Sequence, residues 1–307
     1  MKKITWPEGK RFAFTIVDDT DNATVQNVKP VYDLLYQYGL ITTKTVWVYP
    51  PRDTYTGECL QDVNYLQFVR DLKSKGFEIA LHNVGSGNFT TEEIARGFEI
   101  YCELLGDYPK MHINHAENPD SIYWSKARFC FPVNRFNTHS NKSGIPFSGE
   151  NPESPYFWGE TSKKHITYIR NKVFQDINTL QCDPQTPYRE KKKEKYSNYW
   201  FSSSDGANVE MFNRLLSPEN LNRLEAQGGC CILYTHFTNG FILEDGSLHP
   251  GFVQCVQDLS RRSGWFVPAS HLLDYLQEQR NRTGFASPWR LAMNDFKWLL
   301  NRVLRKY

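Results

Sequence analysis

The sequence predicts an α/β fold built on parallel strands. Over the first two thirds of the chain, short apolar runs alternate with amphipathic stretches, which is the pattern of strand–helix units around a parallel sheet. The chain has 307 residues, 40% of them hydrophobic, enough to bury one large core or two smaller ones. The preferred organisation is one α/β barrel over residues 1–285, followed by a separate helix over residues 286–307.

The first 113 residues contain the clearest elements. A strand at 12–17 precedes a stretch whose apolar residues recur at helical spacing and stop at a glycine. β-Branched and aromatic residues predict the second strand, and a capping box of Thr90 and Glu93 opens the third helix. The expected order is a strand at 12–17, a helix at 25–38, a strand at 43–49, a helix at 63–75, a strand at 77–81, a helix at 90–105 and a strand at 111–113.

The regular alternation stops between about residues 114 and 198, where proline, asparagine, serine and aromatic residues dominate. Because irregular segments of this length are usually functional or disordered, we interpret this one as a long insertion in the barrel. Order returns beyond it. The expected elements are helices after Asn208, Ser217 and Pro250 and at 271–279, and strands at 230–235 and 265–267.

The final helix is amphipathic and basic. One face carries Trp289, Met293, Phe296, Leu300 and Leu304, and around it stand Arg290, Lys297, Arg302, Arg305 and Lys306. Such a helix can lie on a membrane or on a partner. Surface helices normally bury an apolar stripe of this kind, so packing against the protein's own barrel is the preferred interpretation, with peripheral membrane contact as the alternative.

Charge and cysteine content narrow the class of protein. The 36 basic and 34 acidic residues give a formal net charge of +2, too even a balance to indicate a nucleic-acid partner. The first residues lack the apolar run of a signal peptide. Seven cysteines without a CxxC pair are typical of reduced thiols, so we expect a cytoplasmic protein.

Acidic residues directly follow the first strand. Asp18 and Asp19 close its apolar run, and Asp21 adds a third acid. In parallel α/β folds the carboxyl ends of the strands carry the active site, and adjacent carboxylates repel unless a divalent cation compensates them. The alternative is an acidic turn or a helix N-cap, which the same residue types favour.

Histidines stand at the ends of three other predicted strands. His82 follows the strand at 77–81, His236 follows the strand at 230–235, and His112 and His115 straddle the end of the strand at 111–113. Residues three apart on a strand face opposite sides, so one of the last two is expected to reach a metal, and His115 is preferred because it lies further into the loop. His236 can protonate a leaving amine near neutral pH.

These residues, in this order, resemble the motifs of the polysaccharide-deacetylase (NodB-like) family, also called carbohydrate esterase family four. FTIVDDTD is similar to its first motif, a strand ending in Thr-Phe-Asp-Asp-Gly. Its His-x-x-x-His motif is matched at His82, whereas Ser86 stands at the second position. Its arginine-containing third motif aligns with MHINHAENP, which has histidines instead, and its final Leu-x-His motif resembles the segment that ends at His236.

The resemblance implies an irregular (β/α) barrel of about seven strands and a metal-dependent N-deacetylase. By it, Asp18 is the catalytic base and Asp19, His82 and His115 hold the metal, with His115, His112 or His139 replacing the histidine missing at Ser86. His236 is the catalytic acid, and Asp205, which follows Trp200 as in the family's fourth motif, orients it. The metal is expected to be Zn²⁺, with Co²⁺, Ni²⁺ or Mn²⁺ as alternatives.

The expected substrate is an N-acyl amino sugar, a glycan precursor or another small-molecule amide. Two other functions stay open on the sequence. The missing motif residues also fit a catalytically inactive protein that binds glycan, and the same carboxylates and histidines could serve a phosphate-ester hydrolase.

Overall fold

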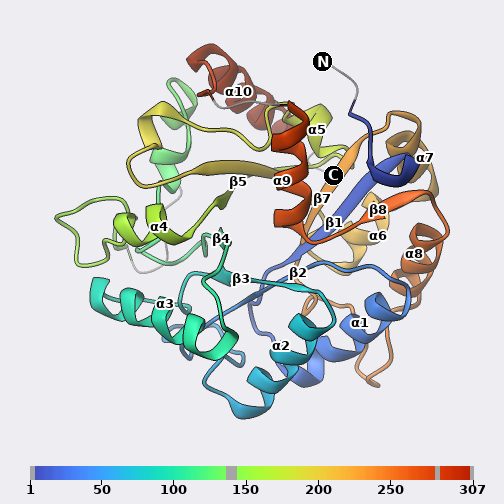
Figure 1. The fold of residues 1–307 in the computed structure, drawn as a ribbon, viewed down its shortest axis with the longest axis horizontal. Helices are drawn as coiled ribbons and strands as arrows, with labels where there is room; N and C mark the ends of the chain where they lie inside the picture. The colour runs from blue at the N-terminus through green and yellow to red at the C-terminus, as the bar shows by residue number, and fades with distance from the viewer. Residues whose placement is uncertain (1–3, 136–143, 281–283, 305–307) are drawn as a thin grey trace.

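In the computed structural model, which describes residues 4–135, 144–280 and 284–304, helices surround a ring of parallel strands (Figure 1). The strands are β1 (Phe12–Asp18), β2 (Thr43–Val46), β3 (Glu78–His82), β4 (Met111–Ile113), β5 (Tyr168–Phe174), β6 (Tyr199–Asp205), β7 (Cys230–Thr235) and β8 (Gly264–Phe266).

The sheet closes on itself through β1. Strands β2 to β7 are hydrogen-bonded in sequence order, and β7 then pairs with β1 along its whole length. The end of β1 pairs with β2, while its beginning pairs with β8, so β1 to β7 form a closed barrel with β8 attached outside the ring. The predicted irregular (β/α) barrel of about seven strands is therefore confirmed.

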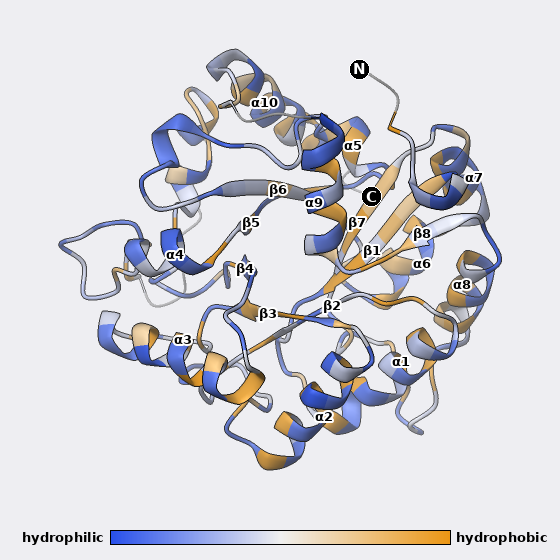
Figure 2. Ribbon diagram, viewed as in Figure 1, coloured by the Kyte–Doolittle hydropathy of each residue, from blue (hydrophilic) through white to orange (hydrophobic). Residues whose placement is uncertain are grey.

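Amphipathic helices cover the barrel and alternate orange and blue along their length in Figure 2. They are α1 (Val25–Gln37), α2 (Val63–Ser74), α3 (Thr91–Leu105), α4 (Gly159–His165), α5 (Thr179–Cys182), α6 (Val209–Leu215), α7 (Pro218–Ala226), α8 (Pro250–Ser260), α9 (Ala269–Arg280) and α10 (Pro288–Leu304). The capping box at Thr90 is present as predicted, with both reciprocal hydrogen bonds formed. Among the described residues, none of these helices is long and apolar enough to cross a membrane.

The segment at 114–198 contains more regular structure than the sequence indicates. It contains short helical turns, α4, α5 and the whole of strand β5, and β6 follows directly. Both strands were missed because their apolar alternation is interrupted: β5 reads YIRNKVF and β6 reads YWFSSSD, with polar side chains that are nonetheless buried. A barrel interior that holds polar groups removes the periodicity on which strand prediction depends.

The last helix packs on the barrel as expected, but it buries the face opposite to the one that the sequence predicts. α10 turns Leu291, Asp295 and Trp298 inward, and Asp295 forms a 2.8 Å ion pair with Lys172 of β5. The stripe predicted to be buried is exposed instead, with Trp289 at 73% exposure. The side chain of Leu304, the last member of that stripe, lies outside the described residues. The sequence pattern failed here because a buried ion pair replaces apolar contacts on the inner face.

Candidate metal centre

Three side chains converge at the carboxyl ends of the barrel strands. Asp21 follows β1, His82 ends β3 and His115 lies just beyond β4. Asp21 Oδ1 lies 3.1 Å from Nε2 of His82 and 3.5 Å from Nε2 of His115. Both imidazoles are almost fully buried, whereas the Asp21 side chain keeps 13% exposure. The cluster is thus open to solvent on the side of the carboxylate.

The hydrogen bonds behind the two histidines fix their tautomers. His82 Nδ1 lies 3.0 Å from the carbonyl oxygen of Ile113, which can only accept, so this nitrogen carries the proton. Asn118 donates its amide to the Gly85 carbonyl, so its Oδ1 accepts, and His115 Nδ1 is the donor at 2.9 Å. In both rings Nε2 is therefore left with a lone pair that points at Asp21.

This arrangement fits a divalent cation. Two imidazole lone pairs and a carboxylate oxygen face one another, and neither Asp21 Oδ1 nor His115 Nε2 has a hydrogen-bond partner although both atoms are buried. Unpaired acceptors in such surroundings are unfavourable unless a cation lies between them. Two imidazoles and one carboxylate, each histidine oriented by an outer hydrogen bond, are typical of catalytic zinc sites.

Asp19, the predicted carboxylate ligand, lies beside this cluster rather than in it. Both of its oxygens are held by Arg170, at 2.8 and 2.5 Å, in a bidentate pair across the barrel interior. Its Oδ2 remains 4.0 Å from His82 Nε2. The sequence did not point to Arg170, because β5 lies in the segment interpreted as an insertion. It also did not point to Asp21 as a member of the cluster, because the resemblance rests on the two acids before it.

Asp18, the predicted base, points away from the cluster. Successive strand residues face opposite sides, so Asp18 and Asp19 diverge. Asp18 Oδ2 contacts Lys44 at 3.0 Å and the Tyr32 hydroxyl at 2.8 Å, and Oδ1 accepts the backbone N–H of Phe237 at 2.9 Å. Its side chain is 1% exposed, and its partners come from β2, from α1 and from the loop that follows β7.

His236 reaches the cluster from the end of β7. Its Nε2 lies 3.0 Å from Asp21 Oδ2, and its Nδ1 faces the Ala207 carbonyl at 3.4 Å. Asp205, predicted to orient this ring, instead accepts the backbone N–H of Ala207 and reaches His236 only through its charge. The Ala207 carbonyl thus occupies the position expected for the Asp205 carboxylate.

The remaining candidates for the missing ligand lie elsewhere or outside the described residues. His112 is buried, with its ring 4.7 Å from that of Trp158 and its Nε2 toward Asn114, and burial lowers its pKa to about 3. Ser86 donates its hydroxyl to Asp53 at 2.7 Å. His139 falls in the part of the chain that is not described.

Charges within the cluster change the pKa values of its members in opposite directions. Burial raises the pKa of Asp21, but without a cation the positive charges that His82 and His115 carry when protonated, together with the hydrogen bond from His236, bring that pKa well below its ordinary value. Burial lowers the pKa of His236, whereas its hydrogen bond to Asp21 and the charges of Asp19 and Asp21 outweigh that effect and raise it. His236 is therefore suited to donating a proton near neutral pH.

Comparison with known proteins identifies the fold. Neither a protein-family model nor a curated protein sequence matches the chain. Among solved structures, a Mycobacterium smegmatis protein assigned as a polysaccharide deacetylase matches with a TM-score of 0.51 and 11% identity over 94% of this chain and 97% of its own. The chain has the barrel fold of polysaccharide deacetylases.

Two further structures share this deacetylase barrel. Puue allantoinase has a TM-score of 0.52 and 12% identity, covering 91% of this chain and 94% of its own. A Pseudomonas aeruginosa protein, also assigned as a polysaccharide deacetylase, has a TM-score of 0.51 and 11% identity, covering 91% of this chain and 95% of its own. Identities this low establish a shared fold, so function has to be argued from the site.

Proposed function

We propose that this protein is a metal-dependent hydrolase of carbon–nitrogen bonds that removes an N-acyl group from a small amide, with an N-acetyl amino sugar as the first substrate to test. The observation that carries the proposal is the convergence of Asp21, His82 and His115, in which the buried atoms Asp21 Oδ1 and His115 Nε2 have no hydrogen-bond partner. The fold supports the proposal as well, because a protein assigned as a polysaccharide deacetylase and an allantoinase have the same barrel as this chain.

The residues around the cluster divide into ligands and proton carriers. Asp21, His82 and His115 hold the cation, Zn²⁺ being the ion that this donor set suits best. When bound, the cation polarises water and the substrate carbonyl. Asp19 replaces Asp18 as the proposed base, since Asp19 faces the cluster while Asp18 is fully engaged on the other side of the strand.

Proton transfer then needs one acceptor and one donor. Asp19 accepts the proton of the attacking water, and Arg170 orients its carboxylate. His236 gives its proton to the departing nitrogen as the carbon–nitrogen bond breaks, leaving a carboxylic acid and an amine. Both ring nitrogens of His236 face oxygen acceptors, Nε2 toward Asp21 Oδ2 at 3.0 Å and Nδ1 toward the Ala207 carbonyl at 3.4 Å, which favours the protonated ring that this step requires.

Metal stoichiometry and product release test this proposal together. Protein stripped with a chelator is expected to bind one Zn²⁺, and the Asp21→Ala variant is expected to lose tight binding because the only carboxylate of the cluster is removed. The loaded protein is then assayed for acetate release from N-acetylglucosamine oligomers, with allantoin and phosphate esters as comparison substrates. Asp205→Asn is the matched control, which retains one equivalent of metal.

Three outcomes would contradict the proposal. Absence of bound metal at saturating supply would favour a glycan-binding protein without activity. Phosphate release without any amide hydrolysis would indicate a phosphate-ester hydrolase. If the wild type and Asp21→Ala bound metal equally well, the metal would not be held by this cluster.

Asn118 is expected to set the metal affinity. It is fully buried, accepts hydrogen bonds from His115 and from the Gly87 backbone, and donates to the Gly85 carbonyl. It therefore ties the ligand to the loop in which Ser86 stands. Loss of an outer hydrogen bond of this kind weakens metal binding by about 10- to 100-fold, so Asn118→Ala should raise the dissociation constant for Zn²⁺ by that factor.

The control for Asn118 is Asn178, a buried asparagine that caps α5 on another part of the barrel. Asn178→Ala should lower the unfolding temperature without changing the dissociation constant for Zn²⁺ measured by competition with a chromogenic chelator. Equal affinities in the two variants would show that Asn118 has a structural role only.

A further inference from the structure

The outer face of α10, formed by Trp289, Met293, Phe296, Leu300 and Val303, is an exposed apolar surface. Its exposed fractions run from 39% at Leu300 to 73% at Trp289. Contiguous apolar surface of this extent on a protein usually marks a binding site. The face continues along most of the helix because these residues recur every three or four positions.

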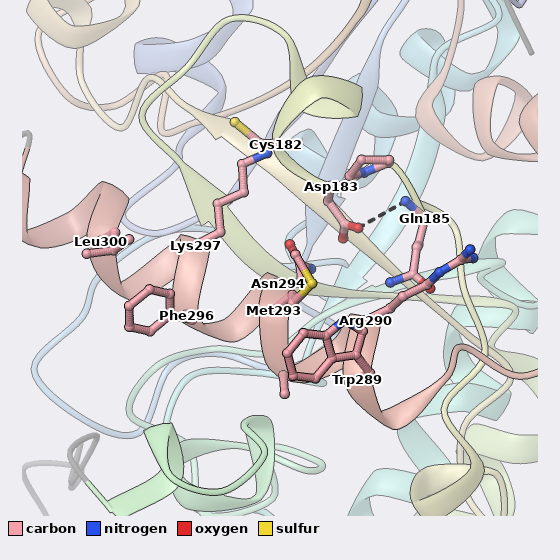
Figure 3. A pocket seen from close by; sticks show the side chains of 12 residues that line it. Cys182, Asp183, Gln185, Trp289, Arg290, Met293, Asn294, Phe296, Lys297 and Leu300 are labelled. Atoms are coloured by element: carbon pink, nitrogen blue, oxygen red, sulfur yellow. Dashed lines mark hydrogen bonds between the residues drawn. The ribbon is translucent and has the colours of Figure 1, made fainter. Parts of the chain in front are cut away.

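This face forms one wall of a groove. The opposite wall comes from the end of α5 and the loop behind it, with Cys182, Pro184 and Gln185, and the cavity between them measures about 750 Å³ (Figure 3). Its lining is mainly apolar. A volume of this size is typical of ligand pockets.

Asn294 is an unpaired polar group in this groove. It lines the cavity, is 6% exposed, and neither its amide nitrogen nor its amide oxygen has a hydrogen-bond partner. A buried amide without a partner is unfavourable, so a ligand that offers both an acceptor and a donor at this depth would gain by pairing with it. Ester oxygens and glycerol hydroxyls of a lipid provide such groups.

The exposed charges that line the groove are basic, whereas Asp183, the acid in the lining, is buried and accepts hydrogen bonds from Thr186 and Ser202. Arg290 and Lys297 line the groove and Arg302 stands exposed at the next turn. The only acidic residue of the helix, Asp295, is buried in its ion pair with Lys172. A second cavity of about 370 Å³ adjoins the beginning of the helix and includes Arg189 and Arg290 in its lining.

We propose that α10 docks on an anionic membrane surface, with its apolar face in the acyl region and its basic residues at the headgroups. Amphipathic helices with basic flanks bind in this way, and each arginine or lysine near an anionic surface strengthens the binding. A second copy of the chain suits this face less well. A two-fold contact along α10 would bring Lys297, near the middle of the stripe, close to its own copy.

The docked helix brings the barrel rim toward the lipid. Asn301, near the end of α10, accepts a hydrogen bond from the backbone of Gln175, which directly follows β5. The carboxyl end of β5 belongs to the same barrel rim as the metal centre. The surface of a membrane would therefore lie beside that rim, whatever the chemistry performed there.

Flotation with vesicles tests the proposal on the full chain. Binding is expected with vesicles of phosphatidylcholine and phosphatidylglycerol, and it should weaken with phosphatidylcholine alone and with added salt. Phe296→Asp should lower the partition coefficient onto vesicles by about tenfold to hundredfold, because burial of one phenyl group is lost. Asn294→Leu should weaken binding to the same vesicles without changing the salt dependence.

Val63, 82% exposed at the start of α2, provides the control. Val63→Asp should bind vesicles like the wild type. Equal binding to both kinds of vesicle, or undiminished binding by Phe296→Asp, would overturn the proposal. Light scattering tests the alternative of a second copy. If the wild type is a dimer that binds no vesicles, and Phe296→Asp dissociates it, the apolar face of α10 is covered by a second copy and the membrane proposal is wrong.

Discussion

Asp19→Asn is expected to lower the turnover number by about 10²- to 10⁴-fold, the usual contribution of a positioned catalytic base. The amide keeps the shape of the side chain and can still accept one hydrogen bond from Arg170, but it cannot take a proton from water. KM should change little, because the proton moves only as the transition state forms. The measurement is steady-state kinetics of acetate release with Zn²⁺-loaded protein.

Metal content separates this role from that of a ligand. Asp19→Asn should still bind one Zn²⁺, because Asp21 is the carboxylate within reach of the two imidazoles. Asp19→Glu, which restores the charge, should recover part of the activity. If Asp19→Asn loses its metal, the family alignment was right about this residue and Asp19 is a ligand. If it retains full turnover, Asp19 is not the base.

Asp18→Ala is expected to lower the free energy of unfolding by about 3 to 5 kcal/mol, because the variant leaves Lys44 as an unpaired buried charge. The Lys44 side chain is 0% exposed and lies 3.0 Å from Asp18 Oδ2. The Tyr32 hydroxyl and the Phe237 backbone would lose their acceptor as well. Urea unfolding followed by circular dichroism measures the change.

Two controls define the cause of this loss. Removing a surface ion pair by Asp107→Ala, whose partner Lys73 is also partly exposed, should change stability by no more than about 1 kcal/mol. Removing both buried charges in Asp18→Leu/Lys44→Met should restore much of the lost stability. An Asp18→Ala protein with wild-type stability and no turnover would instead return the catalytic base to Asp18.

The fold was predictable where side-chain periodicity follows burial. Strand β1 and helices α1, α2 and α3 satisfy this condition, and the sequence places them within a few residues. The condition fails at β5 and β6, which carry Arg170 and three consecutive serines in a polar interior. It fails again at α10, where Asp295 is buried in an ion pair with Lys172 and Trp289 is exposed.

The sequence by itself determined that acids and histidines meet at one rim of a parallel barrel, because strand-end residues in such folds share an edge. Only the tertiary structure decided which way each acid faces. Whether a carboxylate faces the interior or the helices depends on the alternation of β1 and on the partners that each face provides. Lys44 and Arg170, distant in sequence, draw Asp18 and Asp19 to opposite sides and leave Asp21 to His82 and His115.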